Sequence, residues 1–166
     1  MTFEDTKENL IKIGFHGFVT VGSLFNNHAI LPKVKGVYVF LYPSETAPKF
    51  RTIGSGGHFK GRNPNVSLQE LQNNWVEETK IVYIGKAGSI SGSATLHSRL
   101  KQYLDFGKGK AVGHWGGRYI WQLALAEELI VCWKTTPEQD PAAVESYMIG
   151  KFKESYGKRP FANLKD

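Results

Sequence analysis

Two runs of β-branched and aromatic residues constrain the fold of this chain more than any other feature. The run Gly36–Tyr42 begins with a glycine and ends before Pro43, and Lys80–Gly85 has the same apolar character. Runs of this length and composition, bounded by turn residues, predict buried β-strands. A similar run, Leu129–Thr135, predicts a third strand. A chain of 166 residues can bury one core of this kind, so we expect a single domain with a small sheet.

Helical patterns are interspersed with these strands. Leucines at positions 96, 100 and 104 recur every four residues before Gly107, which predicts a helix over Thr95–Phe106. The whole pattern is that of a mixed α/β domain. Two short helices are expected near Thr6–Ile13 and Thr20–Phe25, and another is expected after the capping-box pattern Ser67–Glu70. A longer helix should begin at Asp140-Pro141 and run to Tyr156, with Gly157 as its stop. A short strand is expected at Phe50–Ile53, and the segment Arg118–Leu125 fits either a strand or a helix.

The positive charge of the chain is concentrated in one segment. The whole sequence carries a net charge of +6, and Lys80–Arg118 contains seven basic residues against the single acidic residue Asp105, so this segment accounts for the entire excess. A concentrated basic segment suits a polyanion such as nucleic acid. The alternative is a solvated basic face with no particular partner.

Other features narrow the class of protein. The single cysteine, Cys132, allows neither an internal disulfide nor a cysteine-cluster zinc site. The apolar runs are too short to cross a bilayer, and Met1–Leu10 lacks the character of a secretory signal, so we expect a cytoplasmic protein with no membrane partner. The five histidines, at positions 16, 28, 58, 97 and 114, show no zinc-ligand spacing and are interpreted as structural or surface residues.

One carboxylate falls where the helical pattern is apolar. On the helix expected after Asp140, Glu145 projects within the apolar arc that runs from Val144 through Met148 and Phe152 to Ile149. An ionised carboxylate that faces a core is costly unless a cation or hydrogen-bond donors compensate it. Glu145 is therefore a candidate metal ligand or catalytic carboxylate. The alternative is a glutamate at the edge of the face, which reaches solvent or pairs with an arginine.

Two further patterns point to phosphate. Arg99 and Tyr103 are four residues apart and share a helix face, and a guanidinium can grip a phosphate with two parallel hydrogen bonds. Lys86 follows the strand end Tyr83–Gly85 in a glycine-rich loop, where a phosphate can approach the backbone closely. Each pattern is weak alone, because a surface arginine over a tyrosine ring is common. The spacing of a Walker A loop or a dinucleotide fingerprint is absent.

Taken in order, these residues resemble the GIY-YIG nuclease superfamily, and within it the excinuclease type of nuclease domain. The resemblance covers residues 34–166, and residues 1–33 are expected to be an N-terminal extension packed on that domain. The elements that carry it are Gly36-Val37-Tyr38, Tyr83-Ile84-Gly85, Arg99, Tyr103, Glu145 and Asn163.

The sequence departs from the family pattern in three ways. Val37 stands where the family has isoleucine, and 44 residues lie between Tyr38 and Tyr83 where a short turn is usual. Residues 43–80 are therefore interpreted as an insertion, and long loops at such positions are often functional. The stretch from Tyr83 to Arg99 is also longer than in compact members.

The resemblance implies an α+β fold, with a small three-stranded antiparallel sheet flanked by helices and with Arg118–Leu125 as a helix. It also implies a metal-dependent endonuclease that hydrolyses DNA phosphodiester bonds. Glu145 would hold one Mg²⁺ or Mn²⁺ ion, together with water and substrate phosphate.

The resemblance assigns roles to the other site residues. Tyr83 would activate the attacking water or pass its proton on, with Tyr38 beside it. Lys86 and Arg99 would supply positive charge and stabilise the transition state, while Tyr103 and Asn163 would position the phosphate and its neighbours. The residues expected to contact nucleic acid are Lys86, Arg99, Lys101, Lys108, Lys110 and Arg118.

Two other classes of function stay open from the sequence. One is a nucleic-acid-binding module that keeps the fold without significant turnover, and the other is a basic protein-interaction domain. The sequence does not distinguish DNA from RNA. Specificity would come from residues 43–80, from residues 1–33, from a homodimer or from a partner protein.

Overall fold

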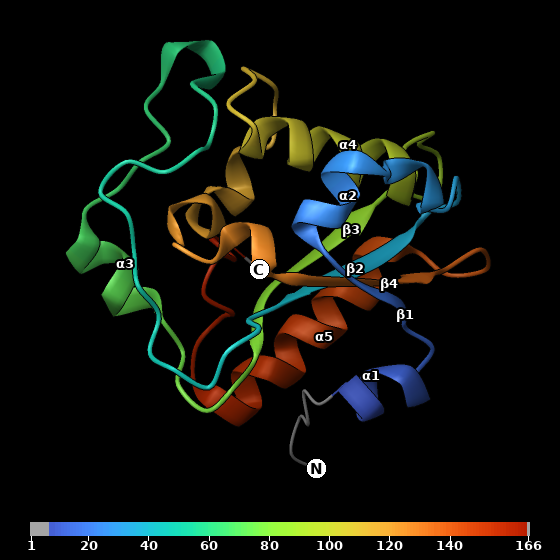
Figure 1. Ribbon diagram of the computed structural model, residues 1–166. Coiled ribbons are helices and arrows are strands. Elements are labelled where there is room, and N and C mark those ends of the chain that lie inside the picture. The colour runs from blue at the N-terminus through green and yellow to red at the C-terminus, as the bar shows by residue number, and fades with distance from the viewer. Residues whose placement is uncertain (1–6, 166) are drawn as a thin grey trace.

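The computed structural model describes residues 7–165 as an α+β fold built on a four-stranded antiparallel sheet (Figure 1). The strands are β1 (His16–Thr20), β2 (Gly36–Leu41), β3 (Ile81–Ala87) and β4 (Ile130–Thr135). They lie in the order β1-β4-β2-β3, so β2 and β4 are central and β1 and β3 form the edges. The three strands predicted from apolar runs are confirmed as β2, β3 and β4.

The expectation of a three-stranded sheet is wrong, because β1 adds a fourth strand from the N-terminal residues. β1 pairs with β4, with an irregularity between Gly17 and Val19. Gly17 and Phe18 have positive φ values of 98° and 57°, and such a bulge breaks the alternation by which a strand is recognised in a sequence. The strand depends on a partner far away in the chain, which local patterns do not reveal.

Helices cover both faces of the sheet (Figure 1). On one face lie α2 (Val21–Asn26), α4 (Leu96–Gly107) and the 3₁₀ segment η3 (Trp115–Gln122). On the other face lie α1 (Lys7–Lys12) and α5 (Pro141–Tyr156). In the described part of the chain, none of the helices has both the length and the apolar character needed to cross a membrane.

Strand β2 divides its side chains between two cores. Tyr38 and Phe40 pack on the side of α4, whereas Val37, Val39 and Leu41 pack on the side of α5. All of β2 is buried, as expected for a strand covered on both faces. Each large apolar side chain buried in this way stabilises the fold by about 1.5–3 kcal/mol.

Local side chains set the helix ends. Thr95 and Ser98 form a capping box at the start of α4, with hydrogen bonds of 2.9 and 3.1 Å. Asp140 accepts a hydrogen bond from the Ala142 amide at the start of α5, and Gly157 ends that helix with φ = 74°. Each N-cap contributes about 1 kcal/mol. These contacts confirm the two long helices, and the shorter ones are found as α1, α2 and α3 (Leu68–Asn74).

The capping box predicted before α3 is only half formed. The Ser67 hydroxyl accepts a hydrogen bond from the Glu70 amide at 3.1 Å. The Glu70 carboxylate instead accepts the hydroxyl of Tyr119 from η3. A tertiary hydrogen bond therefore takes the side chain that would have completed the local cap.

Two segments of ambiguous pattern also differ from expectation. Phe50–Ile53 is not a strand, because only Phe50 forms an isolated bridge, with Leu123. Arg118–Leu125 is not a full helix: it is 3₁₀ as far as Gln122, and Leu123 turns to an extended conformation to make that bridge. Further 3₁₀ turns occur at η1 (His28–Ile30), η2 (Phe59–Gly61) and η4 (Ala126–Glu128).

Residues 43–80 fold against η3 between the ends of β2 and β3 (Figure 1). The buried side chain of Gln122 anchors them: its Oε1 accepts the Val66 amide at 2.9 Å, and its Nε2 donates to the carbonyls of Arg51 and Val66 at 3.0 Å. These residues therefore form part of the packed structure.

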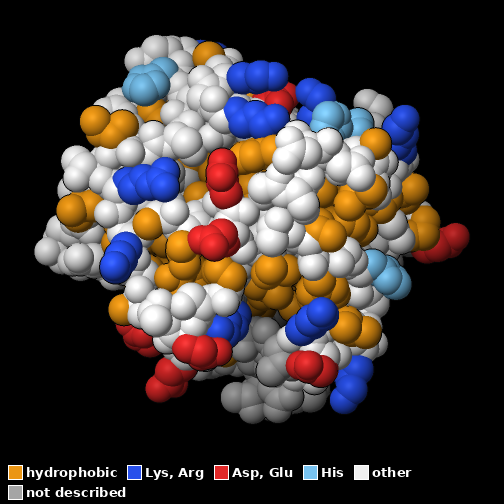
Figure 2. Space-filling model, in the orientation of Figure 1, with side chains coloured by type: hydrophobic (Ala, Val, Ile, Leu, Met, Phe, Trp, Pro, Cys, Tyr) orange, Lys and Arg blue, Asp and Glu red, His pale blue; other side chains and the backbone are white. Residues whose placement is uncertain are grey.

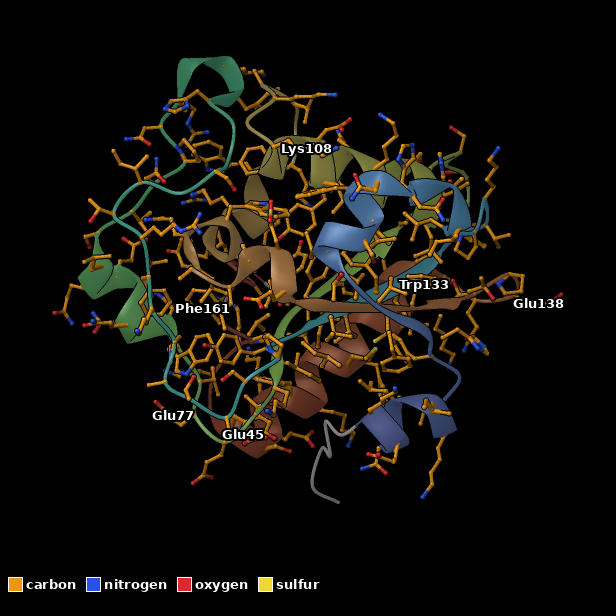
Figure 3. The ribbon with its side chains drawn as sticks, viewed as in Figure 1. Glu45, Glu77, Lys108, Trp133, Glu138 and Phe161 are labelled. Atoms are coloured by element: carbon orange, nitrogen blue, oxygen red, sulfur yellow. The ribbon has the colours of Figure 1, made fainter. Side chains whose placement is uncertain are left out.

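Aromatic packing from the C-terminal segment also holds the insertion. Phe161, labelled in Figure 3, has its ring centroid 5.2 Å from that of Trp75 and 5.6 Å from that of Phe50. Aromatic pairs at these distances contribute about 0.5–1.5 kcal/mol beyond their burial. The C-terminal segment thus connects the insertion to the sheet.

Candidate active site

A pocket of about 660 Å³ opens beside the edge strand β3. Six of the seven residues predicted to be catalytic line it, although they come from β2, β3, α4, α5 and the C-terminal segment. These residues are Tyr38, Tyr83, Lys86, Arg99, Glu145 and Asn163, joined by Gly88, Ser89, Gly92, Ser93, Ala94, Gly116, Leu164 and Lys165.

Strand pairing brings the two tyrosines together. Tyr83 pairs with Phe40 across β2 and β3, and Tyr38 pairs with Gly85. Both tyrosine side chains therefore point to the face covered by α4, with ring centroids 6.0 Å apart. A Cβ atom at Gly85 would overlap the Tyr38 ring. The glycine of the second motif thus makes room for the tyrosine of the first.

Burial raises the pKa of both tyrosine hydroxyls. The pKa of Tyr83 rises to about 12, because burial and the Glu145 carboxylate disfavour the phenolate while Arg99 acts in the opposite direction. The pKa of Tyr38 is raised well above its usual value, chiefly by burial and then by Tyr83. Both hydroxyls therefore keep their protons at neutral pH and can donate hydrogen bonds.

Glu145 reaches the pocket from α5, and Lys86 reaches it from β3. Alternation along the strand places Lys86 on the face opposite to Tyr83, which is the face covered by α5. Burial raises the pKa of Glu145, whereas Lys86, Arg99 and Lys165 lower it. Among residues 7–165, Glu145 forms no ion pair within 4.0 Å. The basic residues that lower its pKa therefore act without a direct ion pair. The alternative interpretation, in which Glu145 pairs with an arginine, does not describe this contact.

The pocket fits a divalent cation bound through one carboxylate. Glu145 is the only carboxylate among its described lining residues, and the part of the chain that the structure describes contains no cluster of three His, Cys, Asp or Glu side chains suited to a metal. Mg²⁺ often uses one or two carboxylates and completes its shell with water and substrate phosphate. A cation here would also offset the burial that raises the Glu145 pKa.

Arg99 presents hydrogen-bond donors to the pocket. Its Nη1 donates to Gln102 Oε1 at 2.8 Å and to the Gly113 carbonyl at 3.4 Å. Its Nε and Nη2 have no hydrogen-bond partner among the described residues. A guanidinium anchored at one nitrogen in this way can donate two parallel hydrogen bonds to a phosphate.

Tyr103 lies beneath the pocket and does not line it. It is fully buried, its hydroxyl donates to the Gly117 carbonyl, and its ring centroid lies 5.3 Å from that of Tyr83. Burial raises its pKa well above the usual value. Tyr103 therefore supports Tyr83 and the turn that brings Gly116 to the pocket, and it makes no direct approach to the space that a phosphate would occupy.

A histidine that the sequence patterns do not single out belongs to the same region. His114 is 1% exposed and stacks on Tyr103, with ring centroids 3.9 Å apart. Within the described residues neither ring nitrogen has a hydrogen-bond partner. Burial, aided by Arg99, lowers its pKa well below the usual value. No ligand spacing surrounds His114 in the sequence, so only the tertiary contact with Tyr103 reveals it.

Asn163 contributes to the pocket through the edge of β3. Its Oδ1 accepts the Ile84 amide at 3.0 Å, and its Nδ2 donates to the Ile84 carbonyl at 2.8 Å. The amide of Ala162 donates to the Val82 carbonyl at 2.8 Å. These bonds close the otherwise unpaired edge of the sheet. The Asn163 side chain thus positions the strand that carries Tyr83, and its amide is already engaged by backbone.

The basic residues expected to contact nucleic acid do not form one group. Lys86 and Arg99 line the pocket. Lys101 and Lys110 both pair with Asp105, at 2.9 and 3.4 Å. Both lysines lower the pKa of Asp105 against the effect of its burial, so part of their charge is already offset within the protein.

Lys108 and Arg118 lie outside the pocket. The Lys108 ammonium is 4.8 Å from the ring centroid of Phe25 and lines a different cavity. The Arg118 guanidinium lies over the ring of Trp115. On the face of the molecule drawn in Figure 2, several Lys and Arg side chains lie at the upper end, where Figure 3 labels Lys108.

Comparison of the chain with protein-family models, with curated proteins and with solved structures found no match.

Proposed function

We propose that this chain is a metal-dependent endonuclease of the GIY-YIG type that hydrolyses DNA phosphodiester bonds at the pocket beside β3. The observation that carries the proposal is the convergence, in one pocket, of two buried tyrosines, a lysine, an arginine with unused donors and one half-buried carboxylate. The order β2, β3, α4, β4, α5 also suits the resemblance, to which this chain adds β1 and residues 43–80.

The charged residues would stabilise the reacting phosphate. Glu145 would hold a Mg²⁺ or Mn²⁺ ion, which when bound supplies positive charge at the phosphate and the leaving oxygen. Arg99 would donate its unused N–H groups to a non-bridging phosphate oxygen, and Lys86 would add charge from the α5 side. Loss of one such preorganised donor typically costs about 10²–10³ in rate.

The tyrosine pair would orient the attacking water. Both tyrosines line the pocket, with ring centroids 6.0 Å apart, and both hydroxyls keep their protons at neutral pH. The Tyr83 hydroxyl can donate to a water molecule in the pocket. Arg99 lowers the pKa of both hydroxyls, so it is the protein group that favours the phenolate form, the only form of a tyrosine that could accept a proton from the water.

The second candidate is a nucleic-acid-binding module with this fold and no turnover. The raised tyrosine pKa values favour it, because a phenol with a pKa of about 12 is a poor base at neutral pH. This candidate predicts salt-sensitive binding without cleavage of any form of DNA.

Plasmid cleavage separates the two candidates. With Mg²⁺ or Mn²⁺ we expect nicking of supercoiled DNA, abolished by EDTA and by Glu145→Gln. Glu154→Gln is a matched control, because Glu154 lies exposed on the same helix and pairs with Lys151 at 3.3 Å. This control variant should cleave like the wild type.

The same variant also tests whether loss of cleavage reflects loss of structure. Because burial raises the pKa of Glu145, its ionised carboxylate destabilises the folded state at neutral pH. Glu145→Gln should therefore unfold no more easily than the wild type. Cleavage by pure Glu145→Gln protein, or no cleavage by the wild type with either metal, would contradict the endonuclease proposal.

A further inference from the structure

Two arginines lie against one tryptophan that directly precedes Gly116, a lining residue of the pocket. The guanidinium carbon of Arg62 lies 4.5 Å from the Trp115 ring centroid, and that of Arg118 lies 4.7 Å from it. Arg62 belongs to the insertion, whereas Trp115 and Arg118 belong to η3. Gly116, which follows Trp115, lines the pocket. We call Arg62, Trp115 and Arg118 the rim cluster.

Backbone contacts hold the two loops of the rim cluster together. The Gly57 amide donates to the Phe106 carbonyl at 2.9 Å, and a Cβ atom at Gly57 would overlap the Lys110 carbonyl. Only a glycine lets the insertion approach the loop after α4 this closely. That loop is tied to the pocket in turn, because Arg99 donates to the Gly113 carbonyl.

The rim cluster carries two positive charges, and that of Arg62 has no ion-pair partner among the described residues. Arg62 and Lys60 are exposed, and within residues 7–165 neither has a carboxylate oxygen within 4.0 Å. Cation–π contacts orient the guanidinium groups but leave their charge in place. Two like charges beside one ring repel each other. Burial lowers the pKa of Arg118 and Arg62 adds to this effect, whereas Tyr119 and Glu70 raise it.

We propose that the rim cluster binds the phosphate backbone of the DNA strand next to the bond that is cleaved, which makes the insertion a nucleic-acid-binding element. This inference rests on the proposed function for the position of the cleaved bond. An anionic phosphate would offset the repulsion between the two guanidinium groups and accept their paired hydrogen bonds. The indole offers a surface against which a sugar or base can pack. Contacts of this kind position the strand and do not read its sequence.

Binding of a labelled DNA duplex in EDTA, followed by fluorescence anisotropy over a range of salt concentrations, tests the proposal. We expect Arg62→Ala to weaken binding about tenfold at low salt and to reduce the slope of log affinity against log salt by about 0.9, the change for one lost phosphate contact. Lys12→Ala removes the same charge from an exposed position on α1, across the sheet from η3. It should leave both quantities unchanged.

A neutral methylphosphonate placed at successive positions of the strand locates the contact. With the wild type, substitution at one position beside the cut site should weaken binding. With Arg62→Ala, substitution at that position should have no further effect, because the interaction is already lost.

The outcomes separate this inference from the endonuclease proposal. Wild-type affinity and salt slope for Arg62→Ala, in a protein that cleaves DNA, would overturn the role of the rim cluster and leave the endonuclease standing. Binding weakened by Arg62→Ala, in a protein that cleaves nothing, would support the rim cluster and reject the endonuclease. No binding of DNA by the wild type at low salt would overturn both.

Discussion

Replacement of Asn163 by alanine should destabilise the fold, because this side chain is bound to backbone. It makes two hydrogen bonds to Ile84, of 3.0 and 2.8 Å, and Ile84 is fully buried. A net contribution of about 1 kcal/mol for each bond, together with the penalty for unpaired buried backbone groups, predicts a loss of about 2–3 kcal/mol in the free energy of unfolding. For a chain of 166 residues, this lowers the melting temperature by about 4–12 °C.

Urea and thermal unfolding, followed by circular dichroism, measure this loss. Asn163→Asp keeps the acceptor for the Ile84 amide but places a carboxylate against the Ile84 carbonyl, so it should lose a similar amount. Asn73→Ala is the control, because Asn73 accepts one bond from Gln69 on the exposed face of α3, and it should cost less than about 0.5 kcal/mol. An Asn163→Ala protein with wild-type stability but impaired cleavage would refute this explanation and make Asn163 a phosphate contact.

Two further predictions concern the packing beneath the pocket. Gly85→Ala should lower the free energy of unfolding in urea by about 1–3 kcal/mol, the usual range for overpacking, because the new Cβ overlaps the Tyr38 ring. Adding Tyr38→Ala in the same chain should relieve part of that loss. Strictly additive losses would show that the two residues do not clash. The pKa of His114 in the folded protein lies below its value of about 6.5 in unfolded chains, so the folded state binds fewer protons and stability should fall as the pH drops below about 6.5. His114→Phe should remove this acid-dependent loss of stability and should be at least as stable as the wild type at pH 7. If the variant loses stability in acid as the wild type does, the loss comes from another group.

The main helices and three strands could be predicted because their signals are local. The Thr95 cap lies within one turn of the residues it serves, and the run Gly36–Tyr42 is buried on both faces whatever its partners are. β1 could not be predicted, because it pairs with β4 and contains two residues with positive φ. The capping box at Ser67 is incomplete for a related reason, since the Glu70 carboxylate accepts a hydrogen bond from a tyrosine far away in the sequence.

The candidate site shows the same division. The resemblance anticipates that Tyr38, Tyr83, Arg99 and Glu145 share a pocket, and the structure places them in one. The contacts that these residues make with the rest of the protein could not be anticipated. His114 has no spacing that marks it, and it joins the site only because the loop after α4 folds back over Tyr103.

The sequence by itself determined the local elements, the concentration of positive charge in Lys80–Arg118 and the identity of the polar residues available for chemistry. Only the tertiary structure decided that Asn163 binds backbone, that Tyr103 lies beneath the pocket and that the insertion brings Arg62 to Trp115. The physical reason is that caps and apolar runs act through neighbouring residues, whereas burial and hydrogen-bond partners depend on which distant segments pack side by side.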